Sequence, residues 1–193
     1  MALLGRPPSG APEGVVAALP YAGRVRDIML GLKYRNRRAV ARHLAGLLVN
    51  RLVAEGLHDD YDVVTWAPTT GRHRRERGFD QAEVIARTVA RQLHLPCRRL
   101  LARRGGGPGQ TGRSRSERLH APEFAARPGV GGLRILLIDD IVTTGATLRS
   151  AGTALELAGA GVVAAAVAAT PVSAAAEVAP LRTAQPFAGS RVA

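Results

Sequence analysis

Two adjacent aspartates and a run of hydroxyl side chains share one short stretch of the sequence. Asp139 and Asp140 follow four branched apolar residues, 135–138, a run typical of a strand buried on both faces. The turn after them contains three threonines, a glycine and an alanine: Thr143, Thr144, Gly145, Ala146 and Thr147. The apolar pattern predicts that a helix over residues 146–158 begins at this turn. Residue types in this order suggest a site for a sugar phosphate.

Each part of this stretch has a chemical partner on such a ligand. The first N–H groups of a helix lack partners within it and carry a partial positive charge, so they bind phosphate. Gly145 lets the backbone approach closely. The hydroxyls of a ribose would donate to Asp139 and Asp140, and Mg²⁺ would offset the remaining charge. The alternative is an ordinary helix start capped by Thr143 or Thr144, which explains the threonines but not the paired aspartates.

A second candidate site is the arginine-dense segment 69–80, which follows a predicted strand over residues 61–66. Ligands of open α/β sheets bind at the carboxyl ends of the strands, so this segment should reach the same rim as the aspartates. We expect an extended loop that turns Arg74, Arg75 and Arg77 onto one diphosphate or a nucleic-acid backbone. The alternative is a solvated basic loop.

The remaining pattern predicts an α/β fold with a mainly parallel central sheet flanked by helices. Strands over 61–66, 134–138 and 162–170 alternate with helices, and this alternation is typical of β-α-β units. Further helices are expected between residues 22 and 52 and from Ala82 to Leu93. The expected divisions are an irregular arm at 1–20, one domain at 21–170 and a flexible tail at 171–193.

Composition narrows the class of protein. The 193 residues are 46% hydrophobic, which excludes wholesale disorder. The net charge is +12 and Lys33 is the only lysine, so a polyanionic partner competes with a genomic preference for arginine as the explanation. Cys97 is the only cysteine, so neither an internal disulfide nor a cysteine-rich zinc site is expected. Without a signal peptide or a long apolar segment, we expect a cytoplasmic protein that does not insert into membranes.

Both motifs resemble one family. Residues 135–148 closely resemble the ribose-phosphate loop of type I phosphoribosyltransferases, which bind 5-phosphoribosyl 1-diphosphate (PRPP). Residues 75–81 resemble the Arg-Glu-Arg-Gly-Phe-Asn-Gln signature of the ComF/GntX-like (competence protein F) subgroup, with Asp80 in place of the asparagine and Thr70 where a histidine is common. The resemblance extends over about residues 20–170. Many members carry an N-terminal zinc ribbon of four cysteines, which is not expected here.

The resemblance implies roles for individual residues. The ribose 5-phosphate site falls on Asp139, Asp140, Thr143, Thr144, Gly145, Ala146 and Thr147. Asp139 and Asp140 would also act in catalysis, and Arg74, Arg75 and Arg77 would hold the diphosphate. No protein metal site is implied, because Mg²⁺ would arrive with PRPP.

Three functions remain open at this point. The first is an enzyme that transfers a phosphoribosyl group from PRPP and releases diphosphate. The second is a protein of DNA uptake that binds single-stranded DNA and competence proteins; residues 72–118 contain 13 arginines and four acids. The third is a PRPP sensor without catalysis. Trp66 and Phe79 are either base-stacking residues or part of the core.

Overall fold

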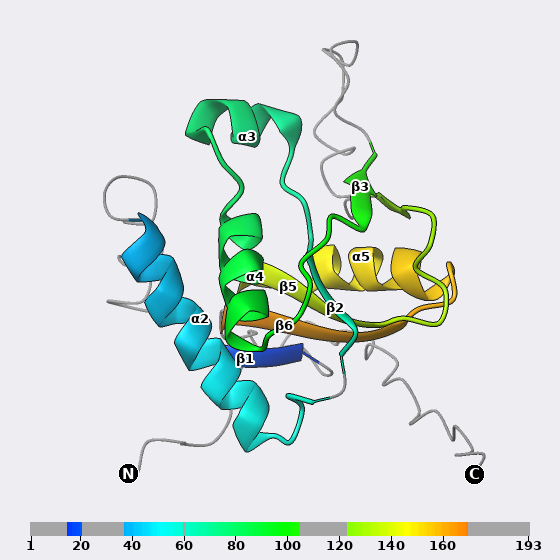
Figure 1. The fold of residues 1–193 in the computed structure, drawn as a ribbon. Helices are drawn as coiled ribbons and strands as arrows, with labels where there is room; N and C mark the ends of the chain where they lie inside the picture. The colour runs from blue at the N-terminus through cyan, green and yellow to red at the C-terminus, as the bar shows by residue number, and fades with distance from the viewer. Residues whose placement is uncertain (1–14, 21–36, 60, 105–122, 170–193) are drawn as a thin grey trace, which may run out of the picture.

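The computed structural model of the chain describes residues 15–20, 37–59, 61–104 and 123–169. Figure 1 shows a central sheet with helices on both sides. The elements in chain order are β1 (Val15–Pro20), α2 (Arg37–Ala54), β2 (Val63–Trp66), α3 (Gly71–Arg77), α4 (Gln81–Gln92), β3 (Leu101–Arg103), β4 (Phe124–Ala126), β5 (Arg134–Val142), α5 (Ala146–Glu156) and β6 (Gly161–Ala169).

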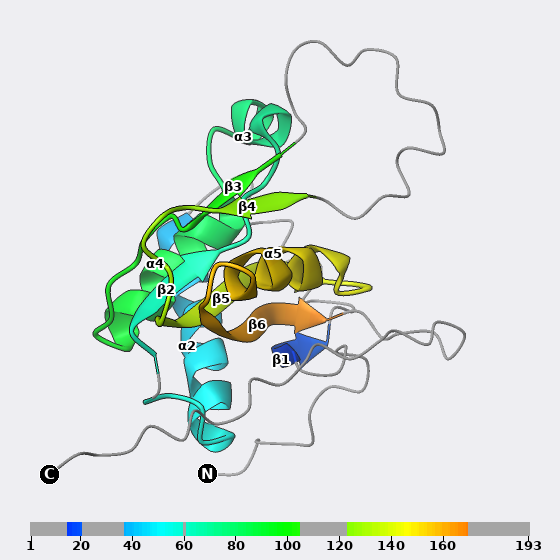
Figure 2. The ribbon, with the colours of Figure 1, turned by 90° about the vertical axis from the view of Figure 1, so that its right-hand side faces the viewer.

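The main sheet has four parallel strands in the order β1-β6-β5-β2. β5 is an inner strand of this sheet. It pairs with β2 on one side and with β6 along its whole length on the other. The short strands β3 and β4 form a separate antiparallel pair. Figure 2 shows this pair beside α5, away from β1. The predicted α/β fold with a parallel sheet flanked by helices is confirmed.

Side chains alternate between the two faces of the sheet, as the pleat of a strand requires. On β5, Leu136 and Ile138 join the core under α2 and α4, whereas Ile135 and Leu137 join the core under α5, β3 and β4. All four of these side chains are fully buried. This explains why the sequence of β5 is continuously apolar rather than alternating.

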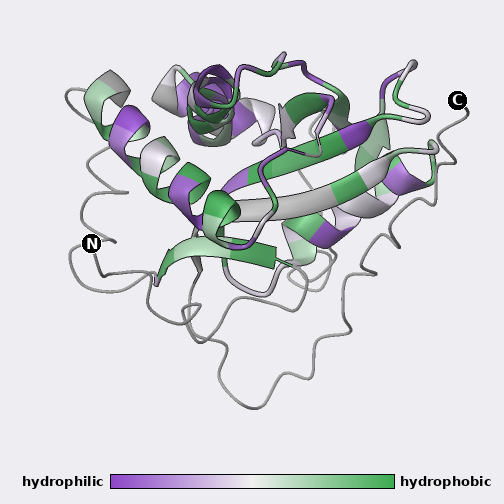
Figure 3. Cartoon of the chain, turned by 60° about the horizontal axis from the view of Figure 1, so that its bottom comes forward, coloured by the Kyte–Doolittle hydropathy of each residue, from purple (hydrophilic) through white to green (hydrophobic). Residues whose placement is uncertain are grey.

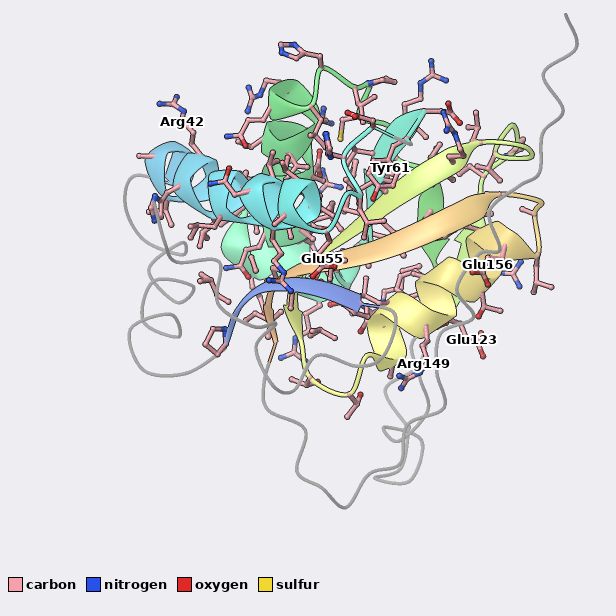
Figure 4. The ribbon with its side chains drawn as sticks, turned by 90° about the horizontal axis from the view of Figure 1, so that it is seen from below. Arg42, Glu55, Tyr61, Glu123, Arg149 and Glu156 are labelled. Carbon is pink, nitrogen blue, oxygen red and sulfur yellow. The ribbon has the colours of Figure 1, made fainter. Side chains whose placement is uncertain are left out.

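The helices cover the sheet with one face and present the other to solvent. In Figure 3 they carry alternating hydrophilic and hydrophobic bands. Seen from below in Figure 4, Arg42 points outward from α2 on one side of the sheet, while Arg149 and Glu156 lie along α5 on the other. This three-layer arrangement leaves the ends of the strands as the places where polar side chains from different elements meet.

Three expectations about local structure were wrong. Residues 15–20 are not part of an irregular arm, because they form β1 and pair in parallel with β6. The arginine segment is not an extended loop, since residues 71–77 form the helix α3. The strand expected to end at Ile138 continues as β5 to Val142, so Asp139 and Asp140 lie within it.

Other expectations fall outside the described residues. They concern residues 1–14 of the expected arm, the first part of the helical region expected between residues 22 and 52, the arginines after residue 104 and the tail at 171–193. Within the part of the chain that the structure describes, none of the helices has the length and hydropathy needed to cross a membrane.

Candidate functional site

Unequal strand lengths create the site. The last pair between β2 and β5 joins Trp66 to Ile138, after which β2 ends and β5 continues to Val142. The chain beyond β2 turns away through Ala67 and Pro68, and Ala67 donates its N–H to the carbonyl oxygen of Ile138 at 3.0 Å. The extra length of β5 therefore borders a space that the neighbouring strand does not fill.

A pocket of about 180 Å³ occupies this position at the carboxyl ends of β2 and β5. It brings together the segment after β2, the start of α4, the end of β3, the extension of β5 and the first turn of α5. Its lining residues are Ala67, Pro68, Thr69, Asp80, Gln81, Ala82, Arg103, Asp139, Asp140, Ile141 and Thr147. The paired aspartates predicted from the sequence thus do line a pocket at the expected rim of the sheet.

The aspartate pair is under electrostatic stress. Asp139 is 8% exposed, and Asp140 is partly buried. Burial raises the pKa of Asp139 well above its usual value, and the neighbouring Asp140 raises it further. Asp139 accepts the backbone N–H of Asp140 at 2.8 Å, which offsets only part of this cost. A ligand that brings hydroxyl donors or a cation would reduce the repulsion between the two carboxylates.

Asp80 adds a third carboxylate that the sequence interpretation did not assign to the site. The residue is 5% exposed, and its carboxylate accepts the backbone N–H of Thr69 at 2.9 Å. Burial raises the pKa of Asp80, and the nearby carboxylates of Asp140 and Glu83 raise it further. The substitution of aspartate for asparagine in the 75–81 signature was a signal that this position is unusual.

Arg103 supplies the positive charge of the pocket, and the sequence interpretation missed it as well. Its guanidinium donates to the carbonyl oxygen of Pro68 at 3.4 Å and lies 5.5 Å from the centre of the Phe124 ring. Burial lowers the pKa of Arg103, while Asp139 and Asp80 raise it. Nothing in the sequence separates Arg103 from the arginines around it, because its role depends on β3 ending beside the pocket.

The predicted phosphate turn lies next to this pocket and shares Thr147 with it. Gly145 is the N-cap of α5 and has the left-handed backbone (φ 73°) that glycine adopts without strain. Neither Thr143 nor Thr144 is the cap, so the ordinary capped-helix alternative does not describe this turn. Both threonines are exposed, and Ala146 donates its N–H to Thr144 Oγ1 at 3.4 Å.

The predicted diphosphate residues lie apart from the pocket lining. Arg74 and Arg75 are exposed on α3, which stands above α4 in Figure 1. The guanidinium of Arg74 lies 3.9 Å from a carboxylate oxygen of Glu83 on α4. Arg77 ends the same helix. The structure therefore groups the aspartates and Thr147 in one pocket but does not bring Arg74 or Arg75 into its lining.

The chemistry of the lining fits a cation that arrives with a phosphate ligand. Mg²⁺ prefers oxygen ligands and usually keeps several waters or substrate oxygens. The three aspartates offer such oxygens, but among the described residues no group of three or more His, Cys, Asp or Glu is arranged to hold a metal ion. Trp66 is buried in the core under α2 and α4, so it is not free to stack on a base from the pocket.

The comparison with known families now decides what this fold is. The sequence matches the phosphoribosyl transferase domain over residues 80–183, which is more than half of the chain. The chain belongs to the phosphoribosyl transferase domain family. This match contains β5, the aspartate pair and the turn before α5, and the expectation of a type I phosphoribosyltransferase fold is confirmed.

A curated relative supports the ComF-like character of this phosphoribosyltransferase-type chain. The chain is 34% identical over 97 residues to competence protein ComFC of Bacillus subtilis (strain 168). The alignment covers 50% of this chain and 39% of ComFC, so the chain spans well under half of that relative. The expected resemblance to ComF-like type I phosphoribosyltransferases is confirmed at this level.

The chain is also similar to solved structures of an amidotransferase and a phosphoribosyltransferase. Glutamine PRPP amidotransferase from B. subtilis is 24% identical with a TM-score of 0.49, over 68% of this chain and 27% of that one. An adenine phosphoribosyltransferase is 18% identical with a TM-score of 0.49, over 71% of this chain and 73% of that one.

Proposed function

We propose that this protein binds PRPP together with Mg²⁺ at the carboxyl ends of β2 and β5 and transfers the phosphoribosyl group to an acceptor. The observation that carries the proposal is the pocket that Asp139, Asp140 and Thr147 share with Arg103. The match to the phosphoribosyl transferase domain, whose range of residues 80–183 includes these aspartates, supports the same ligand.

The proposed binding mode assigns each group of the ligand to a group of the protein. The ribose hydroxyls would donate to the carboxylates of Asp139 and Asp140, and this removes the repulsion between them. The 5′-phosphate would accept from the Thr147 hydroxyl and from the backbone N–H groups at the start of α5. Thr143, Thr144, Gly145 and Ala146 form the rest of this turn.

The diphosphate would meet cationic side chains at the opposite side of the pocket. Arg103 already lines it, held by Pro68 and Phe124. Arg74, Arg75 and Arg77 remain our prediction for this group, since α3 follows directly on the segment that lines the pocket. Bound Mg²⁺ would neutralise phosphate charge and favour departure of the diphosphate.

The reaction requires little covalent chemistry from the protein. The bond between ribose C1 and the diphosphate oxygen breaks, and its electron pair leaves with the diphosphate. The acceptor forms the new bond to C1 and loses its proton to solvent. Asp139 and Asp140 would stabilise the electron-poor ribose, and the arginines would stabilise the leaving group, both through charges that are already in place.

Calorimetry with PRPP and Mg²⁺ tests the ligand, and release of diphosphate with candidate bases as acceptors tests the reaction. We expect binding that requires Mg²⁺ and diphosphate release that requires an acceptor. Binding without release under any acceptor would favour a PRPP sensor over an enzyme. No binding at any Mg²⁺ concentration would refute both.

A second candidate function is binding of single-stranded DNA in competence, as the relationship to ComFC suggests. The specific observation is a set of arginines exposed along α3, α4 and the chain around β3: Arg72, Arg74, Arg75, Arg87, Arg91, Arg98, Arg99 and Arg104. Aromatic residues make up 4% of the chain, so binding would be mainly electrostatic. An affinity for single-stranded DNA that does not fall with salt would exclude this role. A cytoplasmic location and partners among competence proteins also remain predictions.

A further inference from the structure

The charge balance of the pocket is opposite to what a polyanionic ligand needs. Three carboxylates line it, from Asp80, Asp139 and Asp140, and Arg103 is the one basic side chain among the lining residues. Asp139 and Asp140 have partners on the proposed ligand, namely the ribose hydroxyls. Asp80 has no such partner assigned, although only 5% of the residue is exposed.

The hydrogen bond that Asp80 makes does not require its charge. The carboxylate accepts the N–H of Thr69 at 2.9 Å, and this bond joins the two ends of the excursion that contains α3. An amide oxygen accepts such a bond equally well. The charge is therefore not needed for this bond. At the N-cap of α4 it meets the partial positive charge of the helix start, but burial makes it costly.

The charge of Asp80 acts on the same groups that face the ligand. It lines the same pocket as Asp139 and Arg103 and contributes to the raised pKa of Asp139, while it opposes the lowered pKa of Arg103. It thus opposes the approach of phosphate oxygens and offsets the positive charge of Arg103. A divalent cation between the carboxylates and the ligand would reverse that effect.

We propose that Asp80 is a positioning residue that holds Thr69 at the rim of the pocket and, through its negative charge, makes PRPP binding depend more steeply on Mg²⁺ than a neutral residue would. This inference rests on the proposed function, because it concerns the same pocket. It adds a regulatory consequence: the occupancy of the pocket would follow the free Mg²⁺ concentration.

The test is calorimetry of PRPP binding over a series of Mg²⁺ concentrations, from trace to saturating, for the wild type and for Asp80→Asn. Asparagine retains the acceptor for Thr69 and removes only the charge. We expect Asp80→Asn to bind PRPP about five- to tenfold more tightly at low Mg²⁺, with the difference vanishing at saturation. Asp80→Ala, which also loses the acceptor, should bind more weakly than Asp80→Asn at every Mg²⁺ concentration.

A matched control is Asp62→Asn, which removes a carboxylate at the opposite end of β2 and should leave the Mg²⁺ dependence unchanged. If Asp80→Asn has the same Mg²⁺ dependence as the wild type, the inference is overturned while the proposed function stands. If Asp80→Asn does not fold, as judged by thermal unfolding, the inference is also overturned, because the charge would then be structural. If the wild type binds no PRPP at any Mg²⁺ concentration, the proposed function itself has failed.

Discussion

The two ends of the strand pair β2–β5 use the same residue type in opposite ways. At the amino end, Asp62 accepts the backbone N–H of Arg134 at 2.7 Å and its guanidinium at 3.3 Å. These contacts lower the pKa of Asp62. At the carboxyl end, Asp139 is buried against other carboxylates and its pKa is raised.

This difference shows that the fold gives the carboxylate at the amino end enough hydrogen-bond donors but does not do so at the carboxyl end. The carboxylate of Asp62 is exposed to solvent and paired, so it stays ionised at little cost and ties two strands together. The carboxylates at the pocket are held together without enough donors, which costs stability in the absence of a ligand. Perturbed groups of this kind concentrate at functional sites.

The largest expected contrast is in ligand binding. Replacing Asp139 and Asp140 together by asparagine should weaken PRPP binding by about 100-fold or more, because charge-assisted hydrogen bonds to the ribose hydroxyls are lost. Asp62→Asn should leave the affinity unchanged. Calorimetry at saturating Mg²⁺ measures both, and an unaltered affinity in the double variant would place the ligand elsewhere.

Neighbouring arginines offer a sharper comparison within the carboxyl end. Arg103→Gln should weaken PRPP binding by about tenfold or more, since it removes the basic side chain from the pocket lining. Arg104→Gln, one residue further on and exposed, should change it less than twofold. Equal effects of the two variants at the same ionic strength would mean that only the overall charge matters.

Two threonines on α5 test the phosphate turn. Thr147→Val keeps the shape of the side chain and removes the hydroxyl from the pocket, so PRPP binding should weaken by about tenfold. Thr153→Val changes an exposed position on the same helix and should have no effect on affinity. If the two variants bind alike, the 5′-phosphate does not contact Thr147.

The smallest expected effects are on the pH dependence of stability. They have opposite signs for Asp139 and Asp62, which lie at the two ends of the strand pair β2–β5. Because the pKa of Asp139 is raised on folding, the free energy of unfolding should fall as pH rises from about 3.8 through the raised value, and Asp139→Asn should flatten this slope. Because the pKa of Asp62 is lowered, its contribution is present above pH 3.8 and is lost as pH falls through the lowered value.

The contribution of the Asp62 carboxylate to the free energy of unfolding is small, because Asp62 and Arg134 are both exposed. Asp62→Asn should cost about 0.5 kcal/mol at neutral pH. Denaturant unfolding of the wild type and the two single variants between pH 3 and pH 8 measures both slopes. Two results together would contradict this description of the pocket. The stability of the wild type would rise as pH increases above about 3.8, and the Asp139→Asn variant would show the same slope.

Much of the site could be predicted because its parts lie close together in the sequence. The apolar run before Asp139, the hydroxyl-rich turn and the helix after it have local signatures, and the structure confirms the strand, the turn and α5. The helix α4 was predicted within one residue of its bounds for the same reason, since its buried residues recur with helical spacing.

The errors fall where local pattern and final structure disagree. β1 is a short apolar run that contains two alanines, and it owes its conformation to pairing with β6, far along the chain. α3 has a glycine at its first position and four arginines, a pattern that indicated a loop rather than a helix. Neither element could be deduced from its own residues, because long-range packing overrides weak local preferences.

The amino-acid sequence by itself determined the family, the parallel α/β plan and the aspartate pair, because these depend on apolar periodicity and on short motifs whose members are neighbours in the chain. Only the tertiary structure decided that Asp80 and Arg103 share a pocket with that pair and that Arg74 and Arg75 do not. The physical reason is that β2 ends four residues before β5, and the pocket this leaves is lined by whichever side chains other elements bring to it. Such a juxtaposition arises from packing between segments far apart in the chain, and no local pattern encodes it.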